Sequence, residues 1–172
     1  NILLLTSLLE TSIEFGKIDF NTTRFLVFTN KKLKQKILDL YKTYSVKGDV
    51  MILNKPIYTM VRHSRNEIYK LEVAAAKLHI FDYPEIHKYK KILWLDCDII
   101  ISNNLNNIFS IEPKNKLNVA WEGNTKAGYW GMWIWHIQGE ENPNAKAFNC
   151  GILYFNNCEE IKNLFLEIVN FY

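Results

Sequence analysis

Apolar and polar segments alternate along the chain in lengths that predict short strands separated by helices. A short apolar run bounded by polar or turn-forming residues is typical of a buried strand. Such runs occur at residues 2–5, 24–29, 50–53, 92–95, 119–121 and 152–155. A further apolar stretch at 99–101 predicts that the strand at 92–95 continues after a short polar interruption.

Helical spacing of apolar residues occurs between several of these strands. It predicts amphipathic helices over residues 33–44, 68–82 and 161–169, the last beginning near Asn157 or Cys158. Strands that alternate with helices favour an α/β fold with a mostly parallel central sheet. Because neither an internal repeat nor a Gly/Ser-rich linker interrupts the pattern, we expect a single domain over residues 1–172.

Composition narrows the classes of protein. Hydrophobic residues make up 48% of the chain, which indicates a globular protein with a core. The net charge of +3 is too small to indicate a nucleic-acid partner, and no apolar run reaches the length of a transmembrane helix. Cys97, Cys150 and Cys158 lack C-x-x-C spacing, which favours a reducing, cytoplasmic compartment. The excess of lysine over arginine fits a virus or another source with an AT-rich genome.

The candidate chemistry lies at the end of the strand predicted at 92–95. Asp96 and Asp98 follow that strand directly, with Cys97 between them. In α/β sheets, ligands collect at the carboxyl ends of strands. Two neighbouring carboxylates need a cation or a proton to relieve their charge. A divalent metal that carries a phosphate-bearing substrate meets this need, because Mg²⁺ and Mn²⁺ bind carboxylate and phosphate oxygens.

Two other interpretations of the D-x-D motif remain open. The first is a polar strand end with solvated carboxylates. The second is a phosphatase of the haloacid-dehalogenase type, in which the first Asp after a buried strand is the nucleophile. Those enzymes usually have Thr or Val two residues after the second Asp and carry the motif in their first strand. Here Ile100 takes that position, and several predicted strands precede the motif.

Two further segments carry candidate binding residues. Asn149 and Gly151 precede the apolar run at 152–155, where Gly lets a ligand approach the backbone and the Asn amide suits sugar hydroxyls. Alone, the same residues fit a turn that leads into a core strand. Lys77 could neutralise a diphosphate near the two carboxylates, although from spacing alone it is one solvated lysine among many.

A long stretch at residues 123–147 contains glycines, prolines and three tryptophans, and a long insertion beside a catalytic strand is often a functional loop. The tryptophans could form a stacking wall for a sugar acceptor. The other interpretation is an aromatic core or a homodimer contact. These residues are Trp130, Trp133 and Trp135.

In their order along the chain, these motifs resemble those of glycosyltransferase family 8, the group of GT-A-fold enzymes that contains glycogenin and galactinol synthase. That family has K-L-x-x-[FW] on a helix, D-x-D after a strand, and F-N-[SA]-G-[VIL] before another strand. Here the three motifs are residues 77–81, 96–98 and 148–152, with Cys150 in place of the usual Ser or Ala. The resemblance covers residues 68–158 well and the N-terminal part loosely.

The resemblance implies a GT-A, Rossmann-like nucleotide-sugar-binding domain. Its reaction would move a sugar from a UDP-sugar donor, with retention of configuration, to a hydroxyl of a carbohydrate, protein or lipid acceptor. The metal would be Mn²⁺ or Mg²⁺. Asp98 would ligate it directly, and Asp96 would contact both the metal and the donor ribose.

The resemblance also implies the remaining donor contacts. Lys77 would approach the donor phosphate or sugar, and Arg62 or Arg65 would help to bind the diphosphate. The end of the first predicted strand would line the uridine pocket, and the F-N-x-G motif would lie beside the donor sugar. The implied donor-binding residues are Thr6, Ser7, Leu8, Lys77, Asp96, Cys97, Asp98, Asn149, Cys150 and Gly151.

The chain also departs from the family pattern. The C-terminal H-x-x-G-x-x-K-P-W segment, which supplies a metal-ligating His, does not occur, and neither does D-x-x-D-Q. Because the sequence stops at Tyr172 within or just after a predicted helix, we expect a chain shortened at its C-terminus that binds donor weakly and turns over poorly. The missing segments equally fit a non-catalytic nucleotide-sugar or carbohydrate-binding relic of the same fold.

Overall fold

A computed structural model describes residues 2–53, 76–124 and 146–171. Both strands and helices occur along these residues, which confirms a mixed α/β fold. In chain order the elements are α1 (Ile2–Glu14), β1 (Phe25–Thr29), α2 (Lys34–Thr43), β2 (Gly48–Ile52), the 3₁₀ helices η1 (Ala76–Asp82) and η2 (Ile86–Lys88), β3 (Lys91–Leu95), α4 (Asn106–Phe109), β4 (Asn118–Asn124), β5 (Lys146–Asn156) and α6 (Glu159–Phe171).

The described strands form two sheets. β1 and β2 pair in parallel, whereas β3, β5 and β4 form an antiparallel sheet with β5 in the centre. The mostly parallel sheet that we expected is therefore not confirmed. A period-2 pattern predicts that a segment is a strand, but it does not carry the direction in which that strand pairs.

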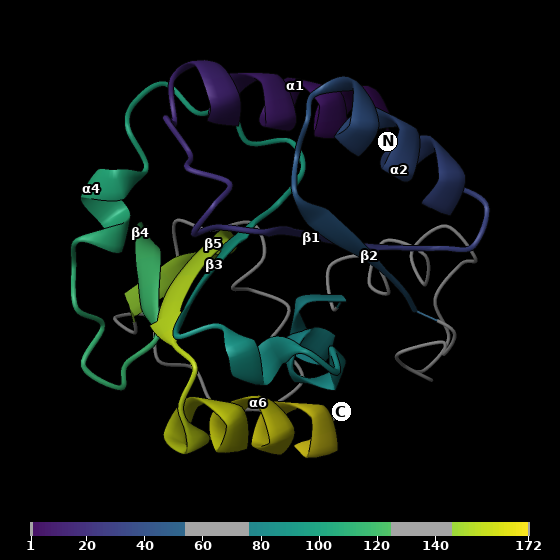
Figure 1. Cartoon of the computed structure of the whole chain (residues 1–172). Coiled ribbons are helices and arrows are strands. Elements are labelled where there is room, and N and C mark those ends of the chain that lie inside the picture. Colours follow the sequence, from purple (N-terminus) through teal and green to yellow (C-terminus); the bar gives the residue numbers. More distant parts are fainter. Residues whose placement is uncertain (1, 54–75, 125–145, 172) are drawn as a thin grey trace.

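Helices lie on both sides of the strands (Figure 1). α1 and α2 cover the parallel pair, and their shared core contains Leu9, Ile37 and Tyr41. On the opposite side, α6 and η1 pack on β3 and β5 around the fully buried Phe155, which lies 5.3 Å from the ring of Phe165. The result is a three-layer arrangement in which the ends of β3 and β5 lie between helical layers.

The strand predicted at residues 2–5 is wrong, because this segment is the start of helix α1. A short apolar run alone does not distinguish a strand from a buried helical segment. The helical signal lies further along, since the buried residues Leu5, Leu8, Leu9 and Ser12 follow 3.6-residue spacing. Leu3 lies off this buried face of the helix, and 73% of its surface is exposed.

Two other expectations around the central strands need correction. Residues 99–101 do not continue the strand, because a turn closed by the hydrogen bond from Ile99 N to Asp96 O follows β3. The helix predicted at 68–82 lies partly outside the described residues, and its described end, η1, is a 3₁₀ helix.

In the part of the chain that the structure describes, no helix combines the length and apolar character needed to cross a membrane.

A polar cluster joins the parallel strand pair to the segment after η1. Arg24 donates two hydrogen bonds to the Asp49 carboxylate, at 3.1 and 3.2 Å, and the Tyr83 hydroxyl donates a third at 2.7 Å. Partial burial pushes the pKa of Asp49 upward. The hydrogen bonds from Tyr83 and Arg24 outweigh this effect and hold the pKa below the ordinary value of 3.8.

We expect Asp49→Asn to lower the free energy of unfolding at neutral pH by up to about 1 kcal/mol, since the pair is partly exposed. A carboxylate with a lowered pKa in the folded state stabilises that state fully above its unfolded pKa, about 4. This contribution is lost as the pH falls through the folded pKa. Urea titrations at several pH values should therefore show the difference between wild type and Asp49→Asn shrinking below about pH 4.

Tyr83→Phe removes one donor to the same carboxylate without changing any formal charge. It should shift stability in the same direction as Asp49→Asn, with a smaller effect. A stability difference between wild type and Asp49→Asn that is constant from pH 7 down to the acid transition would contradict this account of the cluster.

Candidate functional site

The alternation of side chains along β3 decides which face Asp96 occupies. Ile92 and Trp94 belong to the core shared with α6 and η1, whereas Leu93 and Leu95 pack on the opposite side toward α1. Because successive strand residues point to opposite faces, Asp96 continues the row of Ile92 and Trp94. The carboxylate therefore lies on the η1 side of the sheet, at the point where β3 ends.

β5 brings the F-N-x-G motif to the same place. The antiparallel register pairs Leu95 with Ile152, and one step further the Asp96 N–H donates to Gly151 O at 2.8 Å. The Gly151 N–H in turn donates to Asn149 Oδ1 at 2.6 Å. Two motifs that lie far apart in the sequence are thus joined backbone to backbone.

Lys77 reaches this point from η1. The residue is only 7% exposed, and its Nζ donates to Cys150 O at 2.7 Å. The same Nζ lies 3.3 Å from Asp96 Oδ1. Lys77 therefore lies beside Asp96, whereas its contact with a donor phosphate or sugar stays a prediction.

Trp94 is a site residue that the sequence analysis missed. Its indole Nε1 donates to Asp96 Oδ1 at 2.7 Å, and its ring lies 5.8 Å from Lys77 Nζ and 5.5 Å from the ring of Phe28. Two signals could have found it. Residues two apart on a strand share a face, and a Trp N–H usually takes a hydrogen-bond partner when it is buried.

Asp98 and Cys97 occupy the turn after β3, and both are exposed. Within the part of the chain that the structure describes, the Asp98 carboxylate has no hydrogen-bond or ion-pair partner. Asp96 is different, because its side chain is 41% exposed and its Oδ1 accepts a hydrogen bond from Trp94 and forms an ion pair with Lys77. The two carboxylates of the D-x-D motif therefore have distinct environments.

The donor set fits a hard divalent cation in its chemistry. Asp96 Oδ2 and the carboxylate of Asp98 are oxygen ligands of the kind that Mn²⁺ and Mg²⁺ prefer. Among the described residues, no group of three or more His, Cys, Asp or Glu side chains converges on one point. Mg²⁺ is commonly bound through one or two carboxylates together with substrate phosphates and water, so two carboxylates fit such an ion.

The uridine-pocket residues expected at the end of a first strand lie instead within helix α1. The Thr6 hydroxyl donates a hydrogen bond to Ile2 O, one helical turn earlier, at 2.9 Å. Leu8 is buried against Ile101 and Leu105. The structural reason for placing them at a strand end no longer holds, and their donor contact stays untested. Other predicted residues lie outside the described part of the chain: Arg62, Arg65, Trp130, Trp133 and Trp135.

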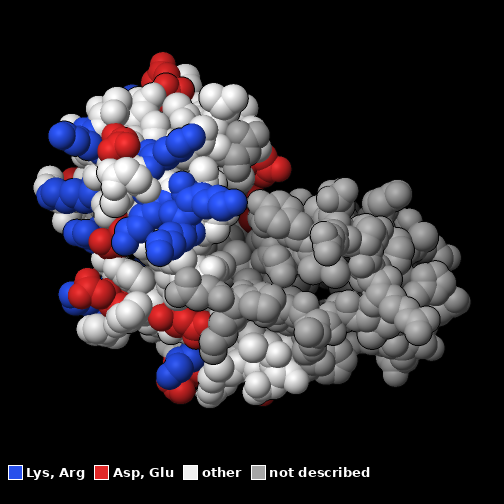
Figure 2. All heavy atoms as spheres, turned by 90° about the vertical axis from the view of Figure 1, so that its right-hand side faces the viewer, with Lys and Arg blue, Asp and Glu red and all other residues white. Residues whose placement is uncertain are grey.

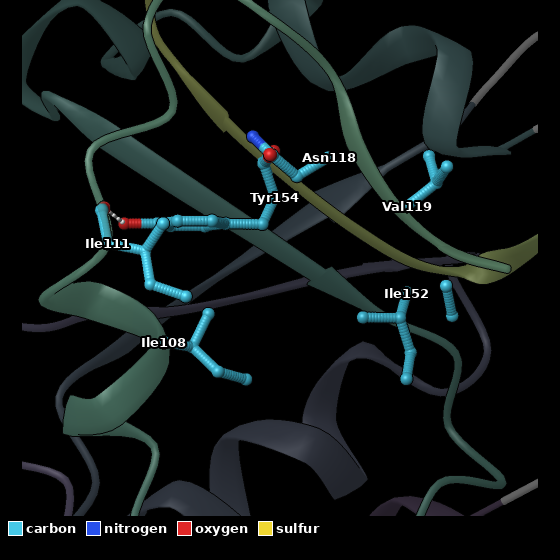
Figure 3. A pocket seen from close by; sticks show the side chains of 7 residues that line it. Ile108, Ile111, Asn118, Val119, Ile152 and Tyr154 are labelled. Carbon is cyan, nitrogen blue, oxygen red and sulfur yellow. Dashed lines mark hydrogen bonds between the residues drawn. The ribbon is translucent and has the colours of Figure 1, made fainter.

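An apolar cavity of about 230 Å³ lies beside α4, β4 and β5 (Figure 3). Tyr154 and Ile111 both line this cavity, and the Tyr154 hydroxyl donates a hydrogen bond to Ile111 O at 2.8 Å. Along β5, Ile152 and Tyr154 alternate with Gly151 and Leu153, so the cavity and Asp96 lie on opposite faces of the sheet. It has no charged lining residue, and we do not assign the nucleotide-sugar chemistry to it. Its lining residues are Ile108, Ile111, Asn118, Val119, Ala120, Ile152 and Tyr154.

Comparison with known protein families agrees with this geometry. The sequence profile of glycosyl transferase family 8 matches residues 3–170, which is nearly the whole chain, and the chain belongs to this family. No individual curated protein gives a significant match. The family assignment leaves the phosphatase interpretation of the D-x-D motif without support.

We expect Lys77→Met to lower the free energy of unfolding by about 1–3 kcal/mol, the range for losing a buried hydrogen-bond partner. Met keeps most of the apolar stem of Lys, so the change mainly removes the ammonium group. Cys150 O loses a donor and Asp96 loses its counter-charge. Chemical denaturation of both proteins at neutral pH measures the difference.

Lys162→Met is the matched control, because the Lys162 side chain is 46% exposed and forms a surface ion pair, with Nζ 3.6 Å from Glu159 Oε2. Its effect should stay within about 0.5 kcal/mol. Equal stability of the two variants would mean that the contacts of Lys77 do not stabilise the fold.

Proposed function

We propose that this chain is a metal-dependent retaining glycosyltransferase that moves a sugar from a UDP-sugar to a hydroxyl acceptor. Glycosyl transfer itself follows from the family to which the chain belongs. The observation that carries the finer proposal is the junction of β3 with β5. There, Asp96 lies beside Asn149 and Gly151 and next to the buried Lys77, and Asp98 follows in the turn after β3.

Each residue at this junction has a task in the proposed reaction. Asp98 and Asp96 Oδ2 hold the metal, which when bound would neutralise charge that develops on the leaving UDP. Lys77 compensates the charge of Asp96 and keeps the end of β5 in place through Cys150 O. The Asn149 amide group is the candidate for hydrogen bonds to the donor sugar, because it carries both donor and acceptor atoms.

The distribution of charge also supports an anionic donor. Figure 2 shows Lys and Arg side chains gathered on part of the described surface. A positively charged surface raises the local concentration of anions such as nucleotide sugars, and added salt weakens this effect. The residues that lead into and begin α2 include four exposed lysines: Lys31, Lys32, Lys34 and Lys36.

The test is a calorimetric titration of the protein with a panel of UDP-sugars, with and without Mn²⁺. We expect saturable binding that is much stronger with the metal than without it and that favours one UDP-sugar over UDP. Asp98→Asn should weaken the metal-dependent binding at least about 10-fold, because it removes a charged ligand. Asp39→Asn on helix α2 is the control and should bind like wild type.

Metal-independent binding of equal affinity in wild type and Asp98→Asn would refute the metal-dependent part of the proposal. Retention is tested separately from metal dependence. If slow hydrolysis of the preferred donor is measurable, NMR of the released sugar should show the anomeric configuration of the donor. Inversion would refute the retaining mechanism.

A further inference from the structure

The two oxygens of the Asp96 carboxylate have different surroundings. Oδ1 accepts the indole N–H of Trp94 at 2.7 Å and lies 3.3 Å from the ammonium of Lys77. The indole hydrogen bond uses one lone-pair direction of Oδ1, and the positive charge of Lys77 beside the same oxygen repels a second cation. Oδ1 is therefore unsuited to bind a cation as well.

The two groups beside Oδ1 are themselves held in place. Lys77 Nζ also donates to Cys150 O at 2.7 Å and lies 5.8 Å from the centre of the Trp94 ring, within the range of a cation–π contact. The Trp94 ring packs against Phe28 from β1, with a centroid separation of 5.5 Å. Each group limits the movement of the next, so the orientation of the carboxylate is set before any ligand arrives.

The space beside Oδ2 is open because residue 151 is glycine. A Cβ at this position would lie 3.3 Å from Asp96 Oδ2 and 2.8 Å from Asn149 Oδ1. Both contacts are tighter than a side chain normally tolerates. Gly151 therefore keeps Oδ2 accessible, and the Asp96 side chain remains 41% exposed.

We propose that Trp94 is a positioning residue for the metal site: its indole N–H, with Lys77, holds Oδ1 so that Asp96 offers a single oxygen, Oδ2, to the cation. This inference rests on the proposed function, since it specifies how the D-x-D motif binds the metal. It also assigns a part to a side chain that never touches the ion. Groups of this kind orient a ligand, and their loss typically lowers metal affinity about 10- to 100-fold.

The test compares Mn²⁺ affinity in wild type and Trp94→Phe, measured by electron paramagnetic resonance of free Mn²⁺ with UDP present. Phe keeps an aromatic ring against Phe28 and Lys77 but has no N–H. We expect Mn²⁺ affinity to fall about 10- to 100-fold. UDP affinity without metal should stay within about 2-fold, because Trp94 acts through Asp96 and the ion. Trp121→Phe is the matched control, since Trp121 is 77% exposed on β4, and it should bind Mn²⁺ like wild type.

The possible outcomes separate the two proposals. Mn²⁺-dependent UDP binding in wild type that is unchanged in Trp94→Phe would overturn the role of Trp94 and leave the proposed function standing. If wild type shows no Mn²⁺-dependent binding, the proposed function fails and this inference fails with it. Equal losses of metal-free UDP affinity and of Mn²⁺ affinity in Trp94→Phe would indicate a general structural role and would also overturn the proposal.

A second variant tests the single-oxygen geometry if Trp94→Phe does not fold. Gly151→Ala leaves the Trp94 hydrogen bond in place but sets a methyl group against Oδ2. It should weaken Mn²⁺ binding at least about 10-fold. Unchanged Mn²⁺ affinity in folded Gly151→Ala would mean that Oδ2 is not the metal-binding oxygen, and it would overturn the proposal.

Discussion

The antiparallel pairing of β3 with β5 is the contact on which the candidate site depends. It continues past the last ladder pair to the hydrogen bond from Asp96 N to Gly151 O, at 2.8 Å. Through this bond the D-x-D turn and the F-N-x-G motif acquire fixed positions, although 49 residues separate them in the sequence. Lys77 then joins the pair from η1 through Cys150 O and Asp96. Without this strand pairing, the residues would belong to three unrelated segments.

Much of this junction could be predicted from the sequence, because its signals are local. The apolar run at 92–95 with Asp96 directly after it corresponds to β3, and the helix near Cys158 begins at Glu159 as α6. Lys77 was singled out through its place in a family motif, because from spacing alone it is one solvated lysine among many; the structure instead buries it, with Nζ 3.3 Å from Asp96 Oδ1.

The errors have physical causes as well. The run at residues 2–5 is as apolar and as short as a core strand, yet it opens α1, whose helical spacing becomes visible only from Leu5 onward. The direction of β5 was missed because alternation looks the same in parallel and antiparallel strands. Trp94 was missed for a different reason. Its role depends on one indole hydrogen bond, and an aromatic residue inside a strand is ordinarily explained by packing alone.

The alternation along β3 has a consequence for how this chain can change over time. Ile92, Trp94 and Asp96 form one row, and Leu93 and Leu95 form the row that packs toward α1. A single-residue insertion or deletion within β3 would exchange the two rows, turning a carboxylate into an apolar layer and a leucine toward Lys77. A substitution in β3 therefore alters one side chain in one row, whereas a change in the length of the strand would disturb the core and the candidate site in one step.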